Sequence, residues 1–272
     1  MLSHTLHVAQ SDMSSTCRVK TYPNGGFELL ACSEPVFHDS GWEGNRKKKK
    51  ASPNGDKNEC SNERAMRRAR AQVRDLALCT PFRYFVTLTL DQTKVDRYDM
   101  AVITKKLNNW LDNQVRRKGL AYVLVPERHQ DGAIHFHGFF NDALSVVDSG
   151  HTDREGHTIY NLPAWSLGFT TAIELYGEYS RAVNYVCKYI GKQGEKPGGR
   201  WFYSGGQLGR PQVSYEGISY REVEAMEGAY TFTPEGSGKA YAIFRREGEN
   251  GLSVAAHEPG PCGNTSVDAW AL

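Results

Sequence analysis

The sequence predicts an α+β fold built on a central antiparallel sheet, and three observations lead to this class. Segments such as 82–91 are rich in β-branched and aromatic residues, as strands are. Other segments, such as 99–117, carry apolar residues at helical spacing. Residues 120–140 have the pattern of two strands joined by a short turn. Hairpin-linked strands with two or three helices indicate a sheet that helices cover on one face.

The first 61 residues predict a pair of strands followed by a linker. Residues 17–37 resemble two short strands around a Pro-Asn-Gly-Gly turn at 23–26. Residues 39–61 are polar, contain glycine and proline, and include four consecutive lysines at 47–50. Because such a composition cannot build a packed core, we expect a linker or mobile arm there.

A basic helix is predicted next, from Asn62 to about Leu78. Asn62 is expected to be its N-cap, and Glu63 suits the positive end of the helix dipole. The apolar residues are expected to dock on the sheet and the arginines to remain on the surface. The arginines in this helix that we expect to contact DNA are Arg64, Arg67, Arg68 and Arg74.

The rest of the core domain follows as an ordered series of elements. In sequence, we expect a strand at 82–91, a helix at 99–117, strands at 120–127 and 133–140, a loop-rich insertion at 142–166, a strand at 168–173 and a helix at 178–190. We therefore assign residues 62–205 to one domain. Residues 206–272 form a C-terminal extension to which the sequence assigns no role.

Charge points to a nucleic-acid partner for part of the chain. The formal net charge is only +2, but residues 46–74 hold eleven Lys or Arg against three acids. That segment is the expected phosphate-contacting surface. No apolar run is long enough to span a bilayer, no signal-peptide pattern opens the chain, and the six cysteines form no Cys-x-x-Cys pair. We expect a cytoplasmic protein with reduced thiols and no membrane partner.

A divalent metal site is predicted at His135-Phe136-His137. Alternate residues of a strand share a face, so both imidazoles project together. Glu127 ends the preceding strand and is expected to lie across from the histidines as third ligand; His129, nearer the turn, is the second choice. Imidazole with carboxylate suits Mg²⁺ or Mn²⁺.

The second chemical signal is the helix that carries Tyr185, Lys188, Tyr189 and Lys192. Positions three and four apart share one helical face. A phenol is a poor nucleophile at its free pKa of about 10, so a neighbouring ammonium and a polarised phosphate would be needed for phosphate chemistry. Half-buried packing by the tyrosines is the alternative. The conjunction with the histidine pair favours catalysis.

Three motifs in this order resemble those of the HUH endonucleases, specifically the rolling-circle replication initiators of phages and plasmids. Residues 85–91 (Phe-Val-Thr-Leu-Thr-Leu-Asp) resemble the first motif, His135-Phe136-His137 the second and Tyr185 to Lys192 the third. Two tyrosines resemble the phage-type branch. The resemblance implies an RRM/ferredoxin-like sheet of about five strands with the histidines on a central strand and the tyrosines on a facing helix.

The resemblance also implies an activity and its partners. A metal would position the scissile phosphate of single-stranded origin DNA, and a tyrosine would attack it to leave a 5′-phosphotyrosine and a free 3′-hydroxyl. The other tyrosine would act when the circle is resealed. Pro234 to Lys239 lacks the spacing of a phosphate-binding loop, so we expect a host helicase to separate the strands and a host polymerase to extend the 3′ end.

Two other functions remain open on the sequence. A single-tyrosine transposase or relaxase could use the same metal and tyrosine chemistry, although relaxases place the tyrosine before the histidine motif. A regulator that binds an origin without cutting it would keep the fold and lose the chemistry. The order of the motifs and the presence of both histidines and both tyrosines favour the nicking enzyme.

Overall fold

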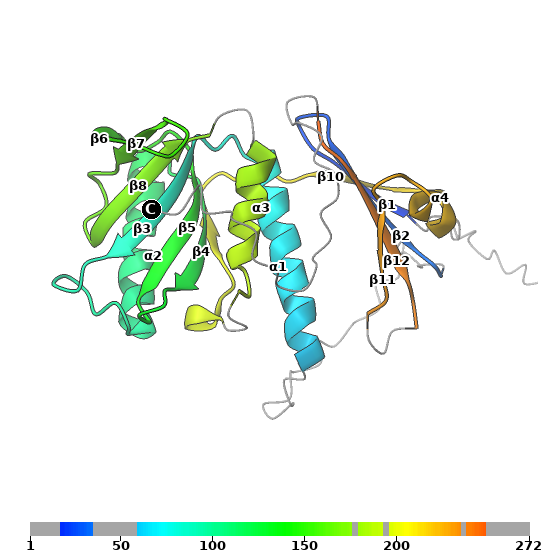
Figure 1. Cartoon of the computed structure of the whole chain (residues 1–272), viewed down its shortest axis with the longest axis horizontal. Coiled ribbons are helices and arrows are strands. Elements are labelled where there is room, and N and C mark those ends of the chain that lie inside the picture. Colours follow the sequence, from blue (N-terminus) through cyan, green and yellow to red (C-terminus); the bar gives the residue numbers. More distant parts are fainter. Residues whose placement is uncertain (1–16, 35–58, 176–178, 193–195, 235–237, 249–272) are drawn as a thin grey trace, which may run out of the picture. The chain divides into compact units, whose positions relative to one another are not determined.

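The computed structural model describes residues 17–34, 59–175, 179–192, 196–234 and 238–248. These residues form two compact units, one around residues 62–211 and one that combines residues before 62 with residues 212–248. Each unit has its own sheet (Figure 1). Among the described residues, no helix combines the length and the apolarity needed to cross a bilayer.

The unit formed by residues 62–211 contains an antiparallel sheet, as predicted for the core domain. Within the described residues the sheet has seven strands, more than the expected five or so, because short strands extend both edges. Their order across the sheet is β6 (Val147–Thr152), β7 (Thr158–Asn161), β8 (Gly168–Glu174), β3 (Tyr84–Leu90), β5 (Ile134–Phe140), β4 (Tyr122–Arg128) and β9 (Tyr203–Gly205). The central position of β3 and β5 places the first two motifs side by side.

Helices cover both faces of this sheet, so the expectation of a single covered face is wrong. Helix α2 (Met100–Lys118) packs on one face through a core that includes Leu107 and Phe136. Helices α1 (Glu59–Cys79) and α3 (Tyr179–Tyr189) pack on the other face through a core that includes Val73, Val183 and Phe139. Phe136 and Phe139 are fully buried on opposite faces, which explains why β5 is apolar on both sides.

The helix boundaries follow local chemistry, with one correction. Asp99 caps α2 by accepting hydrogen bonds from the backbone amides of Ala101 and Val102, and Gly119 ends the helix in the left-handed conformation. Helix α1 begins at Glu59, so Asn62 lies in the first turn and is not the N-cap. Since no glycine or proline stands between Gly55 and Asn62, nothing in the local sequence stops the helix from starting earlier.

The segment 142–166 is not a loop-rich insertion, because it contains the hairpin β6–β7 at the edge of the sheet. The residues of β6, Val-Asp-Ser-Gly-His-Thr, are mostly exposed and polar. Such a strand lacks the alternation of apolar residues that marks a half-buried strand. A register shift between Asp148 and His151 further breaks its pattern.

The other unit joins strands from distant parts of the chain. The predicted hairpin is confirmed as β1 (Cys17–Thr21) and β2 (Phe27–Cys32). These strands are extended by β10 (Gln212–Glu216), β12 (Tyr241–Arg246) and β11 (Tyr230–Phe232), while α4 (Tyr220–Glu224) covers one face through Val223. The segments 1–61 and 206–272 therefore contribute to one unit. The tetralysine lies outside the described residues.

Candidate active site

The site forms on the face of the sheet that α3 covers. In β5, His135 and His137 point to the same face as Phe139, which packs against α1 and α3, whereas Phe136 packs against α2. The shared face of the two histidines follows from the two-residue period of a strand. Residues of β3 and β4 that pair with the histidines supply their neighbours.

Glu127 lies next to His137, as expected from the hairpin. The β4–β5 register pairs Glu127 with His135, yet its Oε2 is 2.9 Å from Nε2 of His137. Its Oε1 accepts a hydrogen bond of 2.9 Å from Nζ of Lys192. Burial raises the pKa of Glu127, but the hydrogen bonds from His137 and Lys192 outweigh it, so the pKa lies below its ordinary value. Glu127 is thus a partly buried carboxylate that stays ionised.

The imidazole of His137 is held on three sides. Its Nδ1 lies 3.1 Å from Oγ1 of Thr87 in β3, and its Nε2 faces Glu127. The ring of Tyr189 stacks on it with centroids 4.3 Å apart and an interplanar angle of 8°. A ring fixed in this way keeps one orientation, and Thr87 together with Glu127 decides which nitrogen carries the proton.

His135 is less constrained and stacks on His129, with ring centroids 5.1 Å apart. Burial, then the positive charges of His137 and His129, lower the pKa of His135, which favours the neutral ring that a metal requires. Nδ1 of His129 contacts Asp131 at 3.3 Å. In this arrangement His129 contacts the metal-site histidine and the turn.

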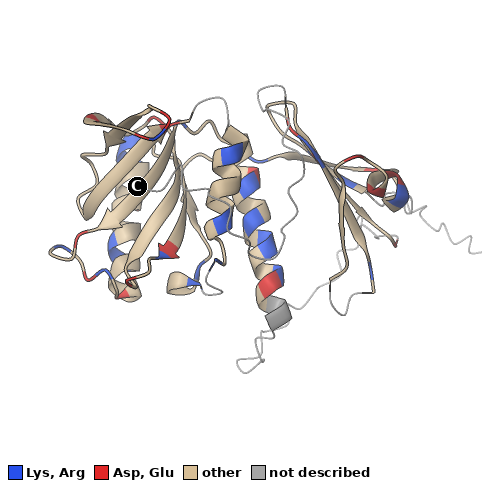
Figure 2. Ribbon diagram, in the orientation of Figure 1, with Lys and Arg blue, Asp and Glu red and all other residues tan. Residues whose placement is uncertain are grey.

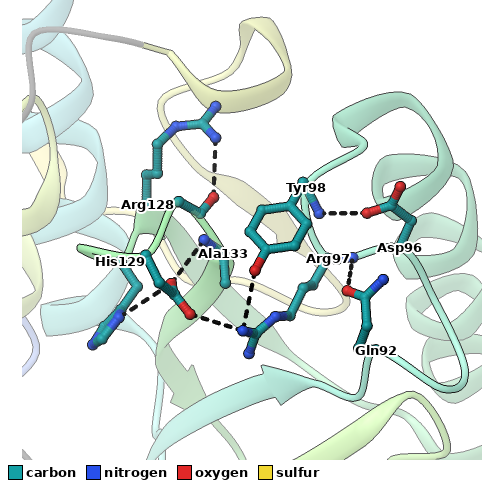
Figure 3. Close-up of polar contacts among 9 residues, drawn as sticks. Gln92, Asp96, Arg97, Tyr98, Arg128, His129 and Ala133 are labelled. Atoms are coloured by element: carbon teal, nitrogen blue, oxygen red, sulfur yellow. Dashed lines mark hydrogen bonds and ion pairs between the residues drawn. The ribbon is translucent and has the colours of Figure 1, made fainter.

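A polar network fixes the turn that carries His129 (Figure 3). The Arg97 guanidinium donates to Asp131 at 2.8 Å and to the Tyr98 hydroxyl at 3.2 Å. Oδ1 of Asp131 accepts from the backbone amide of Ala133 at 3.0 Å. The loop between β3 and α2 thereby ties down the tip of the β4–β5 hairpin, and with it the strands that bear Glu127 and His135.

Both tyrosines of α3 face the histidine strand. The Tyr185 ring packs edge-to-face on Phe85 at 5.8 Å, and the Tyr189 ring lies edge-to-face to Tyr185 at 5.1 Å. The Tyr189 hydroxyl donates a hydrogen bond to the Tyr185 hydroxyl. The two candidate nucleophiles are therefore in contact, next to the ring of His137.

The two lysines of the motif take different positions. Gly191 adopts a φ of +81° just after the last turn of α3, and the chain there turns so that Lys192 reaches Glu127. The Lys192 ammonium also lies 5.4 Å from the centroid of the Tyr189 ring. Lys188 is exposed on the helix itself. The described contacts thus place Lys192 beside the tyrosine and the carboxylate.

Helix α1 supports α3 with two of its arginines. Arg70 donates to the carbonyl of Ile190 through Nη2 at 2.8 Å and Nε at 3.2 Å, and Nη1 of Arg74 donates to Asn184 at 3.1 Å. Basic residues line this helix (Figure 2). Those with exposed side chains are Arg64, Arg67 and Arg68.

Three of the supporting residues were not singled out from the sequence. Thr87 belongs to a Thr-x-Thr alternation in β3, a pattern that does signal two hydroxyls on one face of a strand. The role of Arg70 at the end of α3 depends on the packing of two helices separated by more than a hundred residues. The place of Asp131 between Arg97 and His129 likewise depends on a loop contact that no local pattern shows.

The donor atoms fit a divalent cation in part. Two donors at about 2.1 Å from one ion, at a right angle, are about 3 Å apart, close to the 2.9 Å between Glu127 and His137. Two imidazoles on one ion have ring centres about 5 Å apart, whereas those of His135 and His137 are 6.5 Å apart. Accordingly, the described residues hold no ready group of three His, Cys, Asp or Glu ligands. His135 must turn from His129 to complete the set.

Comparison with known proteins adds one similarity. Residues 83–194 match the family model of the replication-associated proteins, described by the names ORF2 and gene 2 protein. The matched stretch begins just before β3 and ends beyond α3, so it contains the threonine strand, the histidine strand and the tyrosine helix. No curated protein and no solved structure matches the chain.

Proposed function

We propose that this chain is a replication initiator that nicks single-stranded DNA at an origin and rejoins it through a 5′-phosphotyrosine. The observation that carries the proposal is the stacking of Tyr189 on His137, which brings the tyrosine helix onto the histidine strand. The match of residues 83–194 to a replication-associated family supports the same assignment. Fold alone would not, because one fold supports many activities.

The reaction needs one tyrosine as nucleophile. The phenolic oxygen of Tyr185 or Tyr189 forms a bond to phosphorus, the bond from phosphorus to the 3′ oxygen breaks, and that oxygen takes up a proton as the 3′-hydroxyl. The second tyrosine, in hydrogen-bond contact with the first, would accept the next strand or the reverse step. Because the phosphoester bond is conserved, rejoining needs no nucleotide.

The neighbouring side chains would prepare this attack. Lys192, 5.4 Å from the centre of the Tyr189 ring, supplies positive charge near a developing phenolate. His135, His137 and Glu127 are the residues proposed to hold Mg²⁺ or Mn²⁺. Such an ion, when bound, would polarise the scissile phosphate and help to orient it. Positioning and charge stabilisation are the main sources of rate in phosphoryl transfer.

The exposed cations of the two helices suit the DNA backbone. Lys188 on α3 and the exposed arginines of α1 lie on helices that cover the same face of the sheet. Phosphate contacts of this kind position a strand without reading its sequence. Strand opening and synthesis are proposed to come from a host helicase and polymerase.

The test is the covalent adduct. The protein would be incubated with Mn²⁺ or Mg²⁺ and single-stranded oligonucleotides that tile the DNA flanking its gene, then run on a denaturing gel. We expect an adduct with the wild type, none with the Tyr185→Phe/Tyr189→Phe double variant, and a loss with His135→Ala. Tyr160→Phe is the matched control, since Tyr160 packs on the α2 face.

Other results would redirect the assignment. Cleavage without an adduct would mean a nuclease that uses water and would remove the tyrosines from the mechanism. Specific binding of one oligonucleotide without cleavage would favour an origin-binding regulator. An adduct that depends on one tyrosine alone would favour a single-nucleophile strand transferase.

A further inference from the structure

Phe169, in β8, has no role in the chemistry proposed above. Its side chain is 68% exposed, more than that of any other large hydrophobic residue in the described part of the chain. Exposed single apolar residues are common on surfaces, so exposure alone says little. The position of Phe169 relative to the site makes it informative.

The strand registers place Phe169 in one row with the proposed metal ligands. Thr89 in β3 pairs with Phe169 on one side and with His135 on the other, and His135 pairs with Glu127. Directly paired residues of antiparallel strands project from the same face. Phe169 therefore lies on the same face as His135, two strand spacings or about 10 Å away.

The strip of sheet between His135 and Phe169 consists of short hydroxyl side chains. Thr87 and Thr89 in β3 and Thr171 in β8 are partly exposed on this face. Small side chains leave the sheet open there, and threonine hydroxyls are common donors to phosphate oxygens. The strip thus has the size and the chemistry of a floor for a sugar-phosphate chain.

The strand that carries Phe169 is held rigidly. A Cβ at Gly168 would lie 2.1 Å from the carbonyl oxygen of Thr89, so only glycine allows β8 to approach β3 this closely. Trp165 donates to that same oxygen at 3.1 Å, and the amide of Asp91 donates to the carbonyl of Leu167 at 3.0 Å. The phenyl ring is therefore presented by fixed backbone, and binding to it requires little ordering of the protein.

Charge on the same side of the sheet fits a polyanion. Helices α1 and α3 pack on the face that bears Phe169, and the exposed cations on them include Arg68, Arg181 and Lys188. An exposed aromatic ring with nearby cations is the combination that binds single-stranded nucleic acid. A duplex suits it less well, because stacked and paired bases offer no free face to a ring.

We propose that Phe169 stacks on a base of single-stranded DNA, a few nucleotides from the phosphate held at the His135 end of the row. This inference rests on the proposed function for the identity of the ligand. Phe169 acts as a positioning residue: it holds the strand across the threonine floor so that the scissile phosphate reaches the tyrosines.

The test compares DNA with and without bases. Fluorescence anisotropy would measure the binding of labelled oligothymidylate and of an abasic oligonucleotide of equal length to the wild type, Phe169→Ala and Phe169→Trp. Phe169→Ala is expected to weaken binding to oligothymidylate by about tenfold and to leave the abasic affinity unchanged. Phe169→Trp should restore binding, with quenching of its indole fluorescence. Val147→Ala, 54% exposed on edge strand β6, is the control and should change neither affinity.

The outcomes separate this inference from the proposed function. Equal affinity of Phe169→Ala and wild type for oligothymidylate, or an equal loss on both oligonucleotides, would overturn the stacking role. The same comparison in the Tyr185→Phe/Tyr189→Phe background should give the same tenfold effect. If no adduct forms but the base-dependent loss is present, the phosphotyrosine chemistry fails and the stacking site stands.

Discussion

Gly138 lies directly after His137, and a methyl group added there is expected to disrupt the site. A Cβ built on Gly138 lies 1.9 Å from the carbonyl oxygen of Val123 and 2.9 Å from Cα of Leu124. Carbon and oxygen atoms in close contact are about 3.3 Å apart, so β4 and β5 would have to separate by more than about 1 Å. Both obstructing atoms belong to the backbone of β4, which carries Glu127 three residues later.

The expected cost follows from the packing around this pair of strands. Both faces near Gly138 are filled by buried residues, so the strands have no room to relax, and the cost should lie at the upper end of the roughly 1–3 kcal/mol typical of overpacking. At about 2–4 °C per kcal/mol, Gly138→Ala should lower the melting temperature by roughly 6–12 °C. The displacement should also weaken the contact between Glu127 and His137 and reduce adduct formation.

Thermal unfolding followed by circular dichroism would measure this effect. The matched control is Gly119→Ala at the end of α2, where a Cβ meets no atom within 4 Å but φ is +73°. That variant should lose only the backbone preference for glycine, about 1 kcal/mol. If Gly138→Ala melts with the wild type, or no lower than Gly119→Ala, the close approach of β4 to β5 is refuted.

Two further variants test the surroundings of the site. Glu127→Gln should destabilise the protein at neutral pH by about 1–2 kcal/mol, mainly through His137, because the Lys192 side chain is 59% exposed and its ion pair is screened. Since the pKa of Glu127 is lowered in the folded state, this contribution should be full above about pH 4.5 and vanish as the pH falls further, and melting curves of both proteins against pH would show it; a constant difference down to about pH 3 would contradict the shift. Arg70→Met should lower stability by about 1.5–3 kcal/mol because it removes two charged hydrogen bonds to Ile190, and urea unfolding would measure the loss; an unchanged midpoint would mean that Arg70 does not stabilise the end of α3.

The features that the sequence predicts well are those encoded within a few residues. The shared face of His135 and His137 follows from the period of a strand, and the position of Glu127 follows from the turn two residues before β5. The approach of both tyrosines to one helical face follows from their spacing of four. The roles of these residues in catalysis remain predictions.

Other features depend on contacts between distant segments and escape local patterns. Lys192 follows the helix end, so helical spacing describes its direction poorly, and its contact with Glu127 comes from the turn at Gly191. The hairpin β6–β7 is too polar to show an apolar period. The sequence predicts Arg74 on the DNA-facing surface, but its guanidinium donates to Asn184, because α1 and α3 lie side by side.

The sheet of the smaller unit also imposes an order on synthesis. Strands β1 and β2 leave the ribosome early, but β10 and β12, with which they pair, follow only after residues 62–211 have been made. Until then β1–β2 is a two-stranded hairpin, which is marginally stable in water. The strands and helices around the tyrosines, by contrast, are all complete once residue 211 has emerged. A nascent chain can therefore assemble its proposed nicking centre before its smaller unit closes, and a chain interrupted in between would carry that centre with an unfinished sheet.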